Sequence, residues 1–379
     1  MANQRIVALD YIRGISMLGV LGIHTGAYSL TYPAANLHLF AIYEIVTRFS
    51  VPIFFFVSAF GLFLSQPLKK EFHYPTFMYR RFRAVLLPYL TWSILYMLHI
   101  TWISGATDLW HRPLVYKYFL FGLASFQLYF LVILVWFYVL MPLWRQLVSM
   151  ILKAPLIGLV SLLLVQIAFN YYSSYLLHAN YNNHYLNLAI QHRMSYWVLH
   201  YLFIFILGGV CAERYSQFLA LLEQNSRRIT TFFVLTLAGM LSHYYYLIYQ
   251  QQYTLEATAN TVHQLSPFGV LYTVSATLFW FKTFTRPLPE LLAAALHQLG
   301  KYSYLIYLIH PLVMYYLLIE LNQLSKALTP LTTIGFYVTT LALCSGLAWS
   351  INKLGFHVPL LGLLLTGSFP TKNRLDAKA

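Results

Sequence analysis

Three ionisable side chains lie on one face of the first long apolar stretch of the chain. Asp10, Arg13 and His24 belong to the segment LDYIRGISMLGVLGIH. At about 100° per residue, the path from Arg13 to His24 ends about 20° past three full turns, and the path from Asp10 to His24 ends about 40° short of four. An ionisable group in a bilayer costs several kcal/mol, so this stripe is expected to face protein or water and not lipid.

These residue types suit general-base chemistry. Histidine is the side chain whose ordinary pKa lies nearest to neutral pH, so a buried neutral imidazole can take a proton from a hydroxyl. A carboxylate beside a cation stays charged and can orient it. A simpler reading makes Asp10 and Arg13 a structural ion pair and His24 a packed polar residue. The alignment favours a catalytic stripe, with His24 as the base and Asp10 and Arg13 holding the stripe in place.

Two further clusters could hold an anionic or polar ligand. Arg80 and Arg83, in YRRFRAVLLPY, lie on neighbouring faces of one helical turn, and forked guanidinium groups suit phosphate. The alternative is that they only anchor a basic loop at the membrane surface. Ser303 and His310, in KYSYLIYLIHPLV, share one helical face, with His310 about 12 Å into its span. His310 could equally be a hydrogen-bonding group between two helices.

The elements that must position these residues are membrane-spanning helices. Of the 379 residues, 59% are hydrophobic and 9% are charged, whereas a soluble globular chain carries about a quarter charged residues. A span needs about 20 mostly apolar residues. The expected fold is all-α, a polytopic transmembrane bundle of about ten helices with cytoplasmic N- and C-termini. The ten stretches are 6–30, 41–64, 84–104, 119–140, 151–171, 196–212, 229–249, 262–281, 302–320 and 331–352.

The basic residues predict the orientation of this bundle. With the N-terminus inside, 18 of the 24 Lys and Arg residues fall in cytoplasmic segments and 4 in outside loops, while Arg13 and Arg48 lie in spans. Short cytoplasmic loops retain positive charge, so the chain is expected to be a multi-pass protein of the cell (cytoplasmic) membrane. Nucleic-acid binding is disfavoured, because the net charge of +14 is spread over several short segments.

The remaining composition predicts a single membrane domain over residues 1–379, without an extramembrane catalytic domain. Cys211 and Cys344 lie in or beside apolar spans and give neither a disulfide framework nor a metal-binding spacing, so no metal is expected. No long linker, low-complexity tract or obvious repeat divides the chain. The oligomeric state stays open, a homo-oligomer included.

Four motifs follow one another along the chain. They are the Arg13-x10-His24 spacing in a D-x-x-R-G-I context, the run SVPIFFFVSAF at 50–60, Arg80-x-x-Arg83 followed by Pro88-Tyr89, and Ser303…Tyr307…His310. Each motif alone is weak, but four in the right order and on the predicted side of the membrane are strong. Together they resemble the acyltransferase-3 family of membrane acyltransferases, over nearly the whole chain. One departure is Ser58-Ala59, where the family usually has Ser-Gly.

The resemblance implies an O-acyltransferase that moves an acyl group, acetyl above all, from cytosolic acyl-coenzyme A to a hydroxyl of a cell-envelope polysaccharide or glycolipid. His24 would be the base. Arg13 and the pair Arg80 and Arg83 would handle coenzyme A, with Ser303 and His310 beside its arm. The overall look is nearest to the stand-alone members that modify surface polysaccharides.

A rival function from another class is a polysaccharide exporter or flippase. A transporter needs no cytosolic phosphate clamp, and secondary transporters often show inverted repeats, which this sequence lacks. Two segments rich in aromatic residues, Asn and Gln, 171–193 and 244–253, suit a sugar acceptor on the outside. They could equally form the aromatic belt of a membrane interface.

Overall fold

The computed structural model describes residues 6–30, 32, 35–324 and 327–368. Among these residues every regular element is a helix, which confirms the expected all-α bundle. The helices are α1 Val7–Ser29, α2 Leu37–Phe40, α3 Ser50–Ser65, α4 Tyr74–Arg81, α5 Leu87–Ser104, α6 Leu114–Phe121, α7 Tyr129–Val139, α8 Met141–Ile151, α9 Pro155–Tyr171, α10 His184–Gln191, α11 Arg193–Tyr196, α12 Leu202–Glu213, α13 Tyr215–Gln224, α14 Ser226–Tyr249, α15 Leu255–Thr261, α16 Pro267–Phe284, α17 Glu290–Gln323, α18 Pro330–His357 and α19 Pro359–Thr366. The terminal segments predicted to be cytoplasmic, 1–5 and 369–379, lie outside the described residues, as does Lys326.

Several helices are continued by short turns of other helical types. Leu37–Ser65 joins α2, the π-helical turn Ala41–Ile45 and α3, while Tyr74–Ser104 joins α4, the π-helical turn Phe82–Leu86 and α5. The π-helical turn Tyr172–Leu176 extends α9, and the 3₁₀ turn Val198–Tyr201 precedes α12. The 3₁₀ turn Thr107–Trp110 lies between α5 and α6.

The described part of the chain contains seven helical segments long and apolar enough to cross a bilayer, and up to nine if each of two bent pairs is one span. The bent pairs are α7 with α8, at 71°, and Val198–Glu213 with α13, at 102°. The predicted span 262–281 corresponds to α16, which is not among these candidates. Its 18 residues would reach about 27 Å, close to the thickness of a bilayer core. The seven segments are α1, Leu37–Ser65, Tyr74–Ser104, Pro155–Leu176, α14, α17 and α18.

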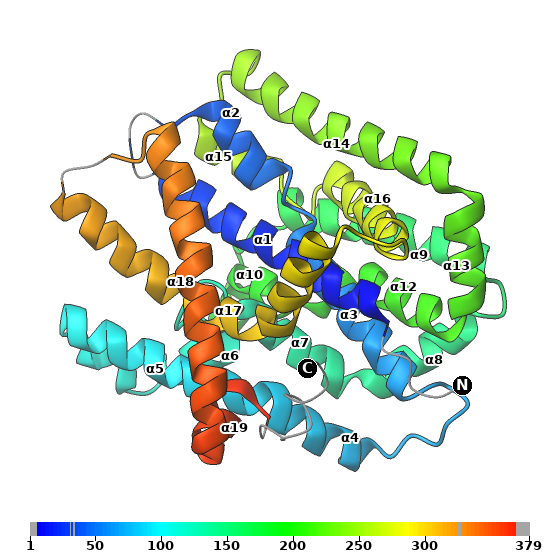
Figure 1. The fold of residues 1–379 in the computed structure, drawn as a ribbon, viewed down its shortest axis with the longest axis horizontal. Helices are drawn as coiled ribbons and strands as arrows, with labels where there is room; N and C mark the ends of the chain where they lie inside the picture. Colours follow the sequence, from blue (N-terminus) through cyan, green and yellow to red (C-terminus); the bar gives the residue numbers. More distant parts are fainter. Residues whose placement is uncertain (1–5, 31, 33–34, 325–326, 369–379) are drawn as a thin grey trace.

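The long helices divide into a buried centre and an exposed periphery. In the most apolar part of α1, 61% of the residues are buried inside the protein, whereas α14 and α18 bury only 22% and Pro155–Leu176 only 17%. Figure 1 shows α1 crossing the middle of the molecule and α14 running along its edge. Apolar side chains such as Leu156 and Leu331, each nearly four-fifths exposed, cover the outer helices. Such a surface suits lipid and not water.

The central pair of helices is α1 and α17, whose backbones approach closely at two glycines. A Cβ at Gly14 would lie 2.5 Å from the carbonyl oxygen of Leu296, and one at Gly300 would collide with the carbonyl oxygen of Asp10. Small residues are what allow helix backbones to come this near in a membrane bundle. The polar stripe of α1 is therefore held against a second central helix.

The structure differs from the predicted spans at two places that bear on the site. The expected helix 119–140 is broken, because Gly122 adopts a left-handed conformation (φ 67°) that ends α6, and α7 begins only at Tyr129. The late helix begins at Glu290 and not near 302, since the segment ELLAAALHQLG favours a helix and follows Pro289. The added turns of α17 are the ones that pack on the beginning of α1.

Contacts between loops define two ends of the bundle. At one end, called the basic end below, Arg145 donates to the carbonyl oxygens of Gln66 and Lys70 at 2.5 and 3.2 Å, and Arg214 donates to that of Leu152 at 2.8 Å. These loops are among those that the charge distribution predicts on the cytoplasmic side.

At the other end, called the opposite end below, a different set of loops meets. Arg193 donates to the carbonyl oxygen of Ser173 at 2.6 Å, and the hydroxyl of Tyr175 donates to that of Thr261 at 2.7 Å. These are loops that the sequence predicts outside. Helix α1 begins at the basic end, where Tyr11 packs on Phe284, with ring centroids 5.7 Å apart.

Candidate functional site

The polar stripe of α1 faces α17 along its length. Near the basic end Asp10 is buried, and its Oδ1 accepts a hydrogen bond from Nη1 of Arg13 at 3.2 Å. His297 of α17 places its Nδ1 3.8 Å from the other oxygen of Asp10. The Asp10–Arg13 pair is therefore anchored, and the guanidinium, with 37% of its side chain exposed, is aimed by a buried carboxylate.

Farther along the same helices, two imidazole rings stack. The ring centroids of His24 and His310 are 5.0 Å apart, with 24° between the planes. Phe126 covers the pair, with its ring 4.4 Å from that of His24 and 6.0 Å from that of His310. Phe126 lies between Gly122, where α6 ends, and Tyr129, where α7 begins. The segment that joins these two helices therefore covers one side of the histidine pair.

The protonation of His310 follows from its partner. Its Nδ1 lies 2.7 Å from the carbonyl oxygen of Tyr307. A carbonyl can only accept, so Nδ1 carries the hydrogen and the neutral ring has its lone pair on Nε2. That Nε2 is buried and has no protein partner. His310 therefore presents a proton-accepting nitrogen inside the bundle, next to the ring of His24, at a position where polar groups are normally satisfied.

A cavity of about 240 Å³ lies between this pair and the basic end. It is bounded by α1, α3, α7, α17 and the junction of α4 with α5. Its polar side chains are two guanidinium groups and several hydroxyls, and no carboxylate lines it. The lining residues used below are Arg13, Ser58, Arg81, Phe130, Tyr138, Ser303 and Tyr307.

Arg81 is a cavity residue that the sequence analysis missed. Its guanidinium lies 5.5 Å from the ring centroid of Phe77 and 5.7 Å from that of Tyr138, and its Nε is buried without a partner. Within the described part of the chain no carboxylate pairs with it. Arg80 is exposed and Arg83 is half-buried, and neither lines the cavity. The only signal in the sequence is the run of three arginines, which does not say which one points inward.

Gln127 is a second residue that the sequence analysis did not single out. It is 1% exposed, and neither its amide nitrogen nor its amide oxygen makes a hydrogen bond of good geometry with the described residues, although the hydroxyl of Tyr96 lies beside it. The main-chain carbonyl of Gln127 accepts a hydrogen bond from the hydroxyl of Tyr307. Tyr307 lies about one helical turn before His310 in α17, so this bond holds Gln127 against the same part of that helix. A polar residue within the run FQLYFL is the signal that could have drawn attention to it. A buried amide N–H without a partner can donate to a ligand oxygen.

The structure thus sorts the predicted site residues into three places. Arg13 and Ser303 line the cavity near the basic end, and Asp10 bonds Arg13 beside it. His24 and His310 meet about 16 Å farther along α1, counted at 1.5 Å per residue from Arg13. The two predicted arginines of the phosphate clamp lie outside the cavity, at the helix turn that also carries Arg81. Within the described ranges no three His, Cys, Asp or Glu side chains gather as metal ligands.

An all-helical bundle with an apolar periphery, a guanidinium-lined cavity and a stacked pair of imidazoles, one buried and one half-buried, defines the class as a multi-pass membrane protein with polar sites in its interior. The chain belongs to the acyltransferase-3 family, since the family model described as an acyltransferase domain matches residues 6–349. Comparison with curated proteins and with solved structures gives no match. Family membership confirms the resemblance seen in the sequence and makes the protein a membrane acyltransferase.

Proposed function

We propose that the protein moves an acyl group, acetyl above all, from cytosolic acyl-coenzyme A to a hydroxyl of a cell-envelope polysaccharide or glycolipid. The observation that carries the proposal is the stacked pair of the half-buried His24 and the buried His310, which lies beyond a cavity that two arginines line. Cations suit the anionic donor, and neutral imidazoles suit removal of a hydroxyl proton.

The donor would enter from the basic end. The guanidinium of Arg81 packs on the rings of Phe77 and Tyr138 and has no carboxylate partner among the described residues. It can therefore bind phosphate without first breaking an ion pair. Arg80 and Arg83 lie at the same turn and would hold the phosphates that stay at the surface. The slender arm of coenzyme A would then pass Arg13 and Ser303 and bring the thioester toward the histidine pair.

The transfer step uses the histidine pair and the buried amide. The acceptor oxygen attacks the thioester carbonyl carbon while His24 takes the hydroxyl proton. The carbonyl oxygen becomes an oxyanion, which the amide N–H of Gln127 can stabilise. The carbon–sulfur bond then breaks, and the coenzyme A thiolate leaves and recovers the proton from the imidazolium. His310, oriented by the carbonyl of Tyr307, supports His24 through their stacked rings.

This direction requires the basic end to face the cytoplasm. A cysteine at Gln251, at the opposite end, is expected to react with a membrane-impermeant maleimide in intact cells, whereas one at Lys70 is not. Labelling of both positions from the same face would contradict the orientation.

The function itself is tested by the mass of the product. Cells with the gene are expected to carry envelope glycans heavier by whole acyl groups than cells without it, and His24→Ala should abolish the difference. The purified protein should release coenzyme A thiol only when a glycan acceptor is present. An exporter or flippase would change the location of the glycan and leave its mass unaltered, which would replace the proposal by its rival.

A further inference from the structure

The opposite end of the bundle contains a second cavity, of about 370 Å³. This volume lies within the range of about 300–1,000 Å³ usual for small-molecule sites. The cavity is separated from the first by the beginning of α7, where Tyr129 lines the second cavity and the adjacent Phe130 lines the first. Its polar lining residues are Arg48, Tyr129, Ser174, Ser195, Tyr201, Asn260, His263 and Gln264.

The one arginine of this second cavity is neutralised. Nη2 of Arg48 lies 2.8 Å from Oε2 of Glu44, and the two side chains are only 13% and 5% exposed. Glu44 is brought here by the π-helical turn Ala41–Ile45, which packs so closely on α1 that a Cβ at Gly26 would lie 2.7 Å from its Cγ. A buried pair of this kind carries no net charge to attract an anion.

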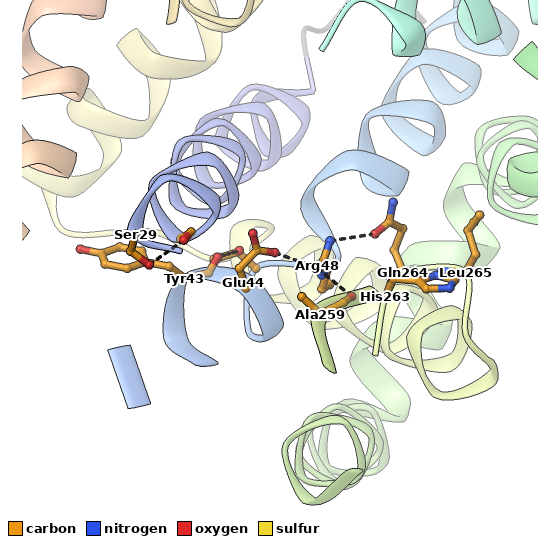
Figure 2. Close-up of polar contacts among 10 residues, drawn as sticks. Ser29, Tyr43, Glu44, Arg48, Ala259, His263, Gln264 and Leu265 are labelled. Carbon is orange, nitrogen blue, oxygen red and sulfur yellow. Dashed lines mark hydrogen bonds and ion pairs between the residues drawn. The ribbon is translucent and has the colours of Figure 1, made fainter. Parts of the chain in front are cut away.

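The paired guanidinium instead orients neutral groups. Arg48 donates through Nη2 to the carbonyl oxygen of Ala259 at 3.2 Å and through Nη1 to Oε1 of Gln264 at 3.4 Å, and Figure 2 shows it reaching from Glu44 to both. The amide nitrogen of Gln264 then donates to the hydroxyl of Tyr201 at 3.4 Å. The orientation of the amide is therefore set by the charge pair.

Two further lining groups are neutral hydrogen-bonding groups. The backbone N–H of Leu265 donates to Nδ1 of His263 at 3.0 Å, so Nε2 carries the ring hydrogen. Burial, together with the nearby charge of Arg48, lowers the pKa of His263 to about 4, so the ring is uncharged at pH 7. The hydroxyl of Ser174 is buried without a protein partner. The cavity thus offers donors and acceptors without net charge.

We propose that this second cavity binds the acceptor as an uncharged sugar residue, with Gln264, His263 and Ser174 hydrogen-bonding its hydroxyls beside the tyrosine rings. The assignment rests on the proposed acyl transfer and adds the site and the charge class of the acceptor. A sugar residue carries hydroxyls that both donate and accept, and its apolar faces suit the amphipathic rings of Tyr129 and Tyr201. A uronate or phosphate would have to displace Glu44 from Arg48 to find a cation.

The first test separates acceptor binding from donor binding. In nanodiscs, Gln264→Leu and Ser174→Val are each expected to raise the KM for the acceptor about 2- to 10-fold, the effect of one lost neutral hydrogen bond. The KM for acetyl-coenzyme A should stay unchanged. Gln251→Leu, an exposed glutamine at the same end, is the matched control and should change neither. An unaltered acceptor KM in both cavity variants would overturn the assignment.

The second test examines the charge class. Envelope polysaccharide from the host cells, freed of acyl groups by mild base, is separated by anion exchange into a neutral and an anionic fraction. The wild-type protein should acylate the neutral fraction, and acylation confined to the anionic fraction would overturn the proposal. If neither fraction were acylated, the proposed function itself would fail.

A third readout does not depend on catalysis. A cysteine in place of the exposed Asn260 should react with a maleimide, and the neutral fraction should slow this reaction at least about threefold while Gln251→Cys is unaffected. Cys211 and Cys344 are buried, so they contribute little background. Equal labelling rates with and without the neutral fraction would show that the cavity is not a sugar site.

Discussion

The two cavities are each lined by arginine, yet they differ in how its charge is compensated. At the basic end Arg13 bonds Asp10, and Arg81 packs on aromatic rings with no carboxylate partner among the described residues. At the opposite end Arg48 is paired with Glu44, and its two terminal nitrogens also donate to an amide oxygen and a main-chain carbonyl. A guanidinium without a carboxylate partner can bind an anionic ligand. A guanidinium paired with a carboxylate leaves the site without net charge. The same side chain therefore suits the donor in one cavity and the acceptor in the other.

The largest effect is expected at His24, the base of the proposed transfer step. General-base catalysis contributes about 10²- to 10⁴-fold, and His24→Gln, which cannot take the proton, should lower turnover by that factor. Acyl-coenzyme A binding should be retained. The measurement is the initial rate of acyl transfer against pH, whose fall in acid should vanish in the variant.

His99→Gln is the matched control for that substitution, because His99 bonds the hydroxyl of Tyr316 away from both cavities. It should behave as the wild type. A His24→Gln protein within a few-fold of wild-type rate, with an unchanged pH profile, would move the catalytic role to His310.

The difference in charge compensation predicts a difference in stability. Arg48→Met should destabilise the protein by about 3–5 kcal/mol, because it leaves the buried carboxylate of Glu44 without its partner. Adding Glu44→Leu should recover most of the loss, while acceptor binding stays weak. Denaturant unfolding in detergent measures the stability of the single and the double variant, and the acceptor KM measures binding. If Arg48→Met proved as stable as wild type, the buried pair would not be the element that neutralises the second cavity.

The buried amide of Gln127, whose main chain contacts Tyr307 of the first cavity, tests how the proposed oxyanion is stabilised. Loss of one such donor typically lowers kcat about 10²- to 10³-fold, so Gln127→Leu should do so with little change in KM. Gln166 offers a control, because its buried amide bonds Asn170, Leu199 and Phe203. Gln166→Leu should lower stability and leave the turnover of the folded protein intact. Similar kcat values for both variants would contradict the assignment.

The smallest effects are expected among the arginines near the basic end. Arg81→Gln should raise the KM for acyl-coenzyme A roughly tenfold, as expected for a lost charged hydrogen bond. The pair Arg80→Ala with Arg83→Ala should raise it only about two- to fivefold, because surface charges are screened. Arg81→Lys should raise the KM less than Arg81→Gln, because lysine keeps the positive charge but lacks the forked guanidinium. If the double alanine variant raised the KM more than Arg81→Gln, the phosphates would be held mainly by Arg80 and Arg83, as the sequence predicted.

Much of the bundle could be predicted because its signals are local. The apolar runs, the stripe of Asp10, Arg13 and His24 and the separation of basic from polar loops all follow from neighbouring residues and helical periodicity. The position of Gln127 could not be predicted, because its carbonyl accepts the hydroxyl of Tyr307, 180 residues away, only where α17 packs against the segment after Gly122. The contact between Nδ1 of His310 and the carbonyl of Tyr307 is local to α17, but the stacking of His310 on His24 depends on the packing of α17 against α1.

The sequence by itself determined that the chain is an all-helical membrane protein and that Arg13 and His24 lie on one face of a helix, since composition and a fixed rise and turn suffice for both. Only the tertiary structure decided that Arg81, and not its neighbours, enters the first cavity. It also decided that Glu44 neutralises Arg48 in the second. Helical phase relative to the bundle and contacts over 200 residues, such as that of Arg48 with Gln264, depend on packing between distant segments. Local periodicity contains no information about them.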